Sequence, residues 1–169
     1  MKILVIRKGG RLERFIIWLA TGSYSGYFPL APGTAGTGMG VLVYLLFSSY
    51  PTPIYLVSTA ATFFLAWWAA EQAEAILGRK DSPRIVIDEI VGYLITMAFL
   101  PLSIPAAIGG FLFFRIFDII KPPPAGSINR RMKGGLAVVL DDAIAGTYAN
   151  LSMQLIIWFF PDFFHRGIP

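Results

Sequence analysis

The feature that most constrains this chain is its long stretches without a single charged side chain. No Lys, Arg, Asp or Glu occurs between Phe15 and Ala70, between Ile90 and Phe114, or between Ala143 and Pro161. A transmembrane helix needs about 20 predominantly apolar residues. Only 14% of the 169 residues are charged, against roughly 25% in soluble domains. The stretches therefore predict a membrane protein rather than a soluble protein with unusually buried helices.

Glycine and proline clusters divide the apolar sequence into helical segments. Residues 21–37 are too rich in Gly, Pro and Ser for a membrane helix and are predicted to form a loop. Residues 11–20 form either a short interfacial helix or a plain basic flank. The five predicted hydrophobic helices cover residues 38–50, 54–77, 87–100, 106–120 and 141–160. The expected fold class is all-α: a polytopic transmembrane helical bundle of about four to five hydrophobic segments, forming one membrane-embedded domain over residues 1–169.

Residues 87–120 could form one tilted helix or a helical hairpin. A straight helix would separate Asp88 from Asp118 by about 45 Å and place them at opposite membrane faces. Pro101 and Pro105 favour a hairpin, because each disfavours helix continuation. Each arm is then about 21 Å long, shorter than a hydrocarbon core of about 30 Å. The hairpin is then either shallow or sheltered by neighbouring helices, and whether residues 87–120 span the membrane fully stays open.

The basic residues predict the orientation in the membrane. They gather before residue 15 and in the 78–87 and 121–140 loops, whereas the turns at 48–53 and 101–105 have none. The positive-inside rule places the basic loops in the cytoplasm. Arg130 and Arg131 are either ordinary positive-inside residues or contacts to anionic lipid. No short apolar core with a cleavage site follows the basic start, so we expect insertion through the internal helices.

Five of the ten acidic residues lie at the predicted cytoplasmic ends of apolar helices in the hairpin topology. They are Asp88, Glu89, Asp118, Asp141 and Asp142. Ionisable groups at membrane depth are costly and suggest function. Carboxylates that meet there need a bound cation or must be protonated. An all-oxygen cluster predicts a hard ion, Mg²⁺ first and Mn²⁺ second.

Each acidic residue also has a structural interpretation. Asp141 or Asp142 could cap the last helix. Asp88 or Glu89 could be a first-turn residue that the helix dipole favours. Asp118 lies near a helix C-terminus, where an anion is disfavoured, and a salt bridge to a neighbouring basic residue would explain it.

Two glycines support a packed site. Gly92 follows Asp88 by four residues and Gly146 follows Asp142 by four, so each shares a helix face with its carboxylate. Small residues let membrane helices approach closely, which serves simple packing as well as a site.

The neighbouring donors fit an anionic substrate. Arg115 and Lys121 flank Asp118 on one helix face. The segment PGTAGT at 32–37 precedes a predicted helix, and its two glycines (Gly33 and Gly36) and two threonines (Thr34 and Thr37) can offer backbone N–H groups and hydroxyls to a phosphate. A metal ion beside such donors can polarise a phosphate and activate water. The pattern predicts phosphoryl chemistry at the membrane surface.

Four blocks carry a family resemblance: PGTAGT at 32–37, DEIVG at 88–92, FRIFDIIKPPP at 114–124 and GGLAVVLDDAIAG at 134–146. In this order they resemble the phosphatidylglycerophosphatase A family. The resemblance implies a Mg²⁺-dependent lipid phosphatase of the bacterial cytoplasmic (inner) membrane. It would hydrolyse phosphatidylglycerophosphate to phosphatidylglycerol and phosphate on the cytoplasmic face. The implied acidic site positions are Asp88, Glu89, Asp118, Asp141 and Asp142, and the implied basic ones are Arg115 and Lys121.

Other functions fit parts of the pattern. A CDP-alcohol phosphotransferase also combines membrane helices, Mg²⁺ and carboxylates, but it needs one dense motif, whereas these acids are spread over three segments. A cation transporter or a non-catalytic membrane protein would use intramembrane carboxylates without needing phosphate donors. The absence of cysteine excludes a cysteine nucleophile. Water and a carboxylate stay open as the nucleophile, as do the number of metal ions and the oligomeric state. With a net charge of +4, the expected partner is anionic phospholipid in the bilayer, not nucleic acid.

Overall fold

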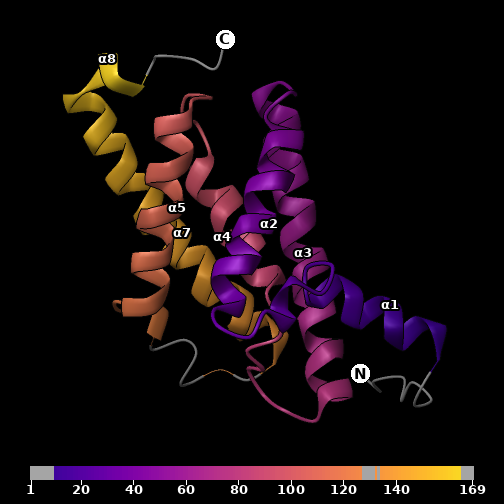
Figure 1. Cartoon of the computed structure of the whole chain (residues 1–169). Helices are drawn as coiled ribbons and strands as arrows, with labels where there is room; N and C mark the ends of the chain where they lie inside the picture. Colours follow the sequence, from indigo (N-terminus) through magenta and orange to yellow (C-terminus); the bar gives the residue numbers. More distant parts are fainter. Residues whose placement is uncertain (1–9, 127–131, 133, 165–169) are drawn as a thin grey trace.

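The computed structural model describes residues 10–126, 132 and 134–164, and this part of the chain is helical without strands (Figure 1). Its elements are α1 (Arg11–Ala20), the short 3₁₀ helix η1 (Ser25–Tyr27), α2 (Pro32–Phe47), α3 (Thr52–Leu77), α4 (Ile87–Met97), α5 (Ile104–Ile120), α7 (Gly135–Phe159) and α8 (Pro161–Phe164). Helix α4 packs against α2, α3, α5 and α7. The all-α prediction is confirmed. The predictions for the chain start, Arg130 and Arg131 concern residues outside the described part.

One described helix, α3, is long and apolar enough to cross a membrane by itself, as judged by length and composition. It ends at Gly78, whose φ of 63° closes the helix in the left-handed conformation. Helix α2 is also apolar but shorter. Helix α1 lies across the side of the bundle (Figure 1), and its helical conformation agrees with the predicted segment 11–20.

Helix α2 begins earlier than the sequence predicted. The expected loop over residues 21–37 is wrong beyond residue 31, because Pro32 starts the helix at a position where its fixed φ is favourable. The glycines that suggested a loop serve helix packing instead. A Cβ atom on Gly36 would lie 2.5 Å from the Val86 Cβ, and one on Gly40 would lie 3.0 Å from the Tyr93 Cβ. Their small size lets α2 pack closely against the start of α4.

The predicted interruption at Pro101–Pro105 is confirmed, although α4 already ends at Met97 and α5 begins at Ile104, and the two helices form a hairpin. Ser103 caps α5 by accepting a hydrogen bond from the Ala106 amide. The Asn150 side-chain amide on α7 donates to the Thr96 and Ala98 carbonyl oxygens, both at 2.7 Å. A neighbouring helix thus satisfies backbone groups that the end of α4 leaves free.

Helix α7 also begins earlier than predicted, at Gly135 rather than Asp141. The Gly135 amide donates to the Glu71 carboxylate of α3 at 2.6 Å, so an acidic side chain on another helix caps the N-terminus. Asp141 and Asp142 consequently lie inside the helix. The N-cap interpretation of these two residues is therefore wrong.

Helices α4 and α7 cross in direct backbone contact. A Cβ atom on Gly146 would lie only 2.3 Å from the Gly92 carbonyl oxygen. The Thr96 hydroxyl, one turn along α4, lies 2.9 Å from the Gly92 oxygen and 3.3 Å from the Gly146 oxygen. The close approach predicted for the two glycines is confirmed, and it sets the distance between the acidic residues one turn before each.

Candidate metal and phosphate site

Three carboxylates from two helices meet beside this crossing. Asp88 and Glu89 occupy the first turn of α4, and Asp142 comes from α7. One ligand atom from each lies within 4.8 Å of the others. Asp88 and Asp142 are buried, and the Glu89 side chain is 12% exposed. The crossing thus gathers acidic groups that lie more than 50 positions apart in the sequence.

The unpaired oxygens of these carboxylates fit a divalent cation. Asp88 Oδ1, Glu89 Oε2 and Asp142 Oδ2 are buried without a hydrogen-bond partner among the described residues. A buried polar atom without a partner is costly, and like charges at this separation repel. An ion bound among three oxygens would relieve both costs. An all-oxygen ligand set favours a hard cation such as Mg²⁺.

Asp118 on α5 lies at the edge of this cluster and is tied to basic residues. Arg115 Nη1 donates to Asp118 Oδ2 at 2.6 Å, and Lys121 Nζ lies 3.7 Å from Asp118 Oδ1. The salt bridge considered for Asp118 is present. Arg115 Nη1 also lies 3.9 Å from Glu89 Oε1. One guanidinium therefore contacts both arms of the hairpin, which places residues 88–89 and 118 at the same end of the bundle.

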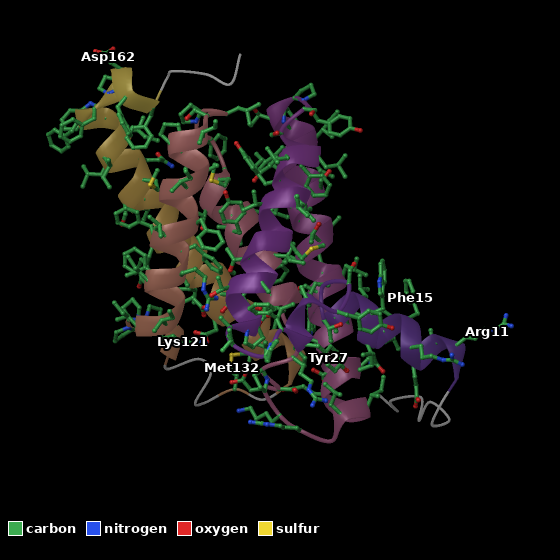
Figure 2. All side chains as sticks on the ribbon, viewed as in Figure 1. Arg11, Phe15, Tyr27, Lys121, Met132 and Asp162 are labelled. Carbon is green, nitrogen blue, oxygen red and sulfur yellow. The ribbon has the colours of Figure 1, made fainter. Side chains whose placement is uncertain are left out.

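Asp141 is not one of the three clustered carboxylates, and as the residue before Asp142 it lies about 100° away around the helix axis. It is buried and pairs closely with Lys121, which follows the last turn of α5. Burial lowers the pKa of Lys121, but the hydrogen bond to Asp141 and the charges of Asp142, Asp141 and Asp118 outweigh it and raise that pKa overall. Lys121 is therefore a stable cation at this end of the bundle (Figure 2).

The N-terminus of α2 reaches the same place through Gly33. A Cβ atom on Gly33 would lie 2.5 Å from Glu89 Oε1 and 2.9 Å from both terminal nitrogens of Arg115. The Ala35 amide bonds to the Ala31 carbonyl oxygen, so the Gly33 and Thr34 amides precede the first intrahelical bond. First-turn amides and the helix dipole attract anions. A glycine here lets the backbone come close to Arg115 and Glu89.

The other candidate donors of the PGTAGT segment take different positions. Thr34 is exposed on the first turn. Gly36 packs against Val86. Thr37 is buried, and its hydroxyl donates to the Gly33 carbonyl oxygen at 2.9 Å. The structure thus brings Gly33, one of the two glycines of this predicted segment, closest to the charged groups. Its place directly after a proline at a helix start was the available signal.

Comparison with known proteins identifies one matching family and three relatives. The family model for phosphatidylglycerophosphatase A matches residues 18–157. A phosphatidylglycerophosphatase A of Haemophilus influenzae is 37% identical over 133 residues, covering 78% of this chain and 82% of that protein. The phosphatidylglycerophosphatase A of Escherichia coli is 32% identical over 129 residues, covering 76% and 75%. A Bacteroides thetaiotaomicron protein, provisionally named a phosphatidylinositol-3-phosphatase, is 35% identical over 154 residues, covering 84% and 93%. No solved structure matches significantly.

Proposed function

Because the chain belongs to the phosphatidylglycerophosphatase A family, and is therefore a phosphatase acting on a phosphate monoester, we propose that it hydrolyses phosphatidylglycerophosphate. The products are phosphatidylglycerol and inorganic phosphate. The observation that carries this proposal is the convergence of three buried carboxylates with Arg115 and the α2 N-terminus. This arrangement offers oxygen ligands to a cation directly beside donors for a phosphate.

In this proposal Asp88, Glu89 and Asp142 hold Mg²⁺. Asp118 and Asp141 complete the site by holding Arg115 and Lys121 in place. Bound there, Mg²⁺ would neutralise phosphate charge and polarise the phosphorus. Without a cation the five carboxylates outnumber the two basic side chains, so a phosphate dianion would be repelled. Substrate binding should therefore depend on the divalent ion.

The protein's donors orient the phosphate. Arg115 can share its guanidinium between the carboxylates and a phosphate oxygen, because its buried Nε has no partner among the described residues. Lys121 and the Gly33 and Thr34 amides supply further positive potential. Water forms the new bond to phosphorus while the bond to the glycerol oxygen breaks. A carboxylate of the cluster accepts the proton from water and returns it to the leaving glycerol oxygen, so that the carboxylate is regenerated.

We further place the protein in the bacterial cytoplasmic membrane as a multi-pass bundle with the site at the cytoplasmic face. Large apolar side chains are exposed along α2, α3, α5 and α7, including Leu42, Phe64, Leu112 and Leu155. Such extensive apolar exposure is typical of a membrane-facing surface. On α1, the exposed Leu12, Phe15 and Trp18 accompany Arg11 and Arg14, as in an interfacial helix that binds anionic lipid.

Phosphate release from purified protein in mixed micelles tests the function. We expect Mg²⁺-dependent release from phosphatidylglycerophosphate, loss of release with a chelator, and recovery when Mg²⁺ is restored. Phosphatidylinositol-3-phosphate, the substrate class in one relative's name, is compared in parallel and should react more slowly. Release that persists under chelation would contradict the metal requirement. A faster reaction with the inositol lipid would overturn the substrate assignment.

Replacing Gly33 by Ala should lower kcat/KM about a hundredfold with little loss of stability. The added methyl meets only the ends of the Glu89 and Arg115 side chains, which can move aside but then leave their working positions. The matched control is Gly38→Ala in the same helix, where the new Cβ has no neighbour within 4 Å. The control should keep full activity and gain about 0.5–1 kcal/mol of stability. Equal activity of the two variants would show that Gly33 does not contribute to the phosphate site.

A further inference from the structure

An apolar groove lies between α2 and α5. It has a volume of about 180 Å³ and is lined by Val41 of α2 and by Ala107, Ile108, Phe111 and Leu112 of α5. Tyr93 of α4 supports it from within the bundle: its hydroxyl donates to the Ala107 carbonyl oxygen at 3.0 Å, and its ring centroid lies 6.5 Å from that of Phe111. Three helices therefore fix the shape of this groove.

The same three helices lead from the groove to the charged site. On α5, Arg115 follows Phe111 by one turn, and on α4, Glu89 precedes Tyr93 by one turn. On α2, Gly33 precedes Val41 by about two turns. Gly33, Glu89 and Arg115 are in mutual contact range. The lining residues Phe111 and Leu112 thus lie about 5–6 Å from Arg115 along the axis of α5.

We propose that this groove binds one acyl chain of the lipid substrate while its phosphate lies at Arg115 and the α2 N-terminus; this rests on the proposed function. The groove fits an amphiphile because anion-binding groups stand at one end and the rest of the lining is hydrocarbon. Burial from lipid tails into the groove brings little hydrophobic energy, since both environments are apolar. Its contribution is to align the headgroup with the site.

A second apolar groove offers a comparison. It has a volume of about 370 Å³, lies between α5, α7 and α8, and includes Met153, Ile156 and Phe163 in its lining. It shares Ile108 and Leu112 of α5 with the first groove, whereas its α7 residues follow Asp142 by at least 11 positions, which is about 16 Å or more along the helix. Because the two grooves share part of α5, only the residues that belong to one of them, such as Val41 and Phe111 or Met153 and Ile156, can tell the two apart.

Photo-crosslinking of the intact protein in vesicles tests the groove without relying on turnover. The probe is phosphatidylglycerophosphate with a diazirine in the middle of one acyl chain, and phosphatidylcholine with the same diazirine reports ordinary surrounding lipid. With Mg²⁺ present and the light pulse given directly after mixing, before much substrate is hydrolysed, we expect the phosphate lipid to label Val41 or Phe111 in preference to Ile156. Labelling with the same pattern for both lipids would overturn the proposal.

Groove-filling variants provide the kinetic test. Val41→Trp should lower kcat/KM for the long-chain lipid about tenfold while leaving hydrolysis of the deacylated headgroup, glycerophosphoglycerophosphate, unchanged. The controls are Leu42→Trp, an exposed neighbour on the same helix, and Ile156→Trp in the second groove. Equal loss for both substrates, or equal loss in the controls, would contradict the groove assignment. A wild-type protein that releases no phosphate from either substrate would instead contradict the proposed function, and the crosslinking pattern would still decide the groove.

Discussion

Replacing Asp142 by Asn is expected to lower phosphate release about a thousandfold while preserving the fold. The substitution removes one of three carboxylates that meet within 4.8 Å, so a Mg²⁺ ion held there would lose a charged ligand. A bound metal contributes several kcal/mol of transition-state stabilisation. Losing about 4 kcal/mol of it corresponds to a thousandfold slower reaction. In the absence of metal the variant should be at least as stable as the wild type, because one buried like charge is removed.

Two measurements on purified protein check this prediction. The first is phosphate release at saturating Mg²⁺, and the second is the rise in melting temperature that Mg²⁺ produces over a chelator. We expect the variant to lose both. The matched control is Asp162→Asn, which makes the same change at an exposed residue near the opposite end of the bundle (Figure 2). Turnover near the wild-type rate, or an unchanged Mg²⁺-induced stabilisation, would remove Asp142 from the metal site.

Replacing Gly146 by Ala is expected to reduce stability and activity together. Its Cβ would lie 2.3 Å from the Gly92 carbonyl oxygen, and real Cβ atoms essentially never come within 3.0 Å of another atom. Backbone on α4 cannot rotate away as a side chain can, so the two helices must separate by about 0.7 Å or more. We expect a loss of about 3 kcal/mol in the free energy of unfolding. Displacing Asp88 and Glu89 from Asp142 should lower activity about a hundredfold.

The control for this prediction is Gly109→Ala on α5. There the new methyl meets the Cε and Sδ atoms of Met153, at 2.8 and 2.9 Å, and a methionine end can move aside. Thermal unfolding in detergent and phosphate release well below both transition temperatures provide the readouts. The Gly109 variant should stay close to the wild type in both. A Gly146 variant with wild-type stability would show that α4 and α7 do not cross in backbone contact.

The hairpin break is a feature that local sequence predicted correctly. Pro101 and Pro105 predicted the interruption, and the structure ends α4 at Met97 and resumes at Ile104. The helix starts were less predictable. Residues 32–37 and 134–135 contain glycines that weaken isolated helices, so α2 and α7 were both predicted to begin too late. Their actual starts depend on Val86 packing at Gly36 and on Glu71 capping at Gly135. Both partners lie far away in the sequence.

Local sequence was sufficient to predict an all-helical fold, the position of the hairpin break, and the residue types that could hold a metal and a phosphate. These properties follow from hydrophobic composition and from helix-breaking residues, whose effects on the backbone extend only a few positions along the chain. Local sequence could not predict that Asp142 lies with Asp88 and Glu89 while the adjacent Asp141 pairs with Lys121, because this depends on how the helices pack. That choice depends on the angle and depth at which two helices cross, and the crossing at Gly92 and Gly146 is set by contacts between backbones more than 50 residues apart.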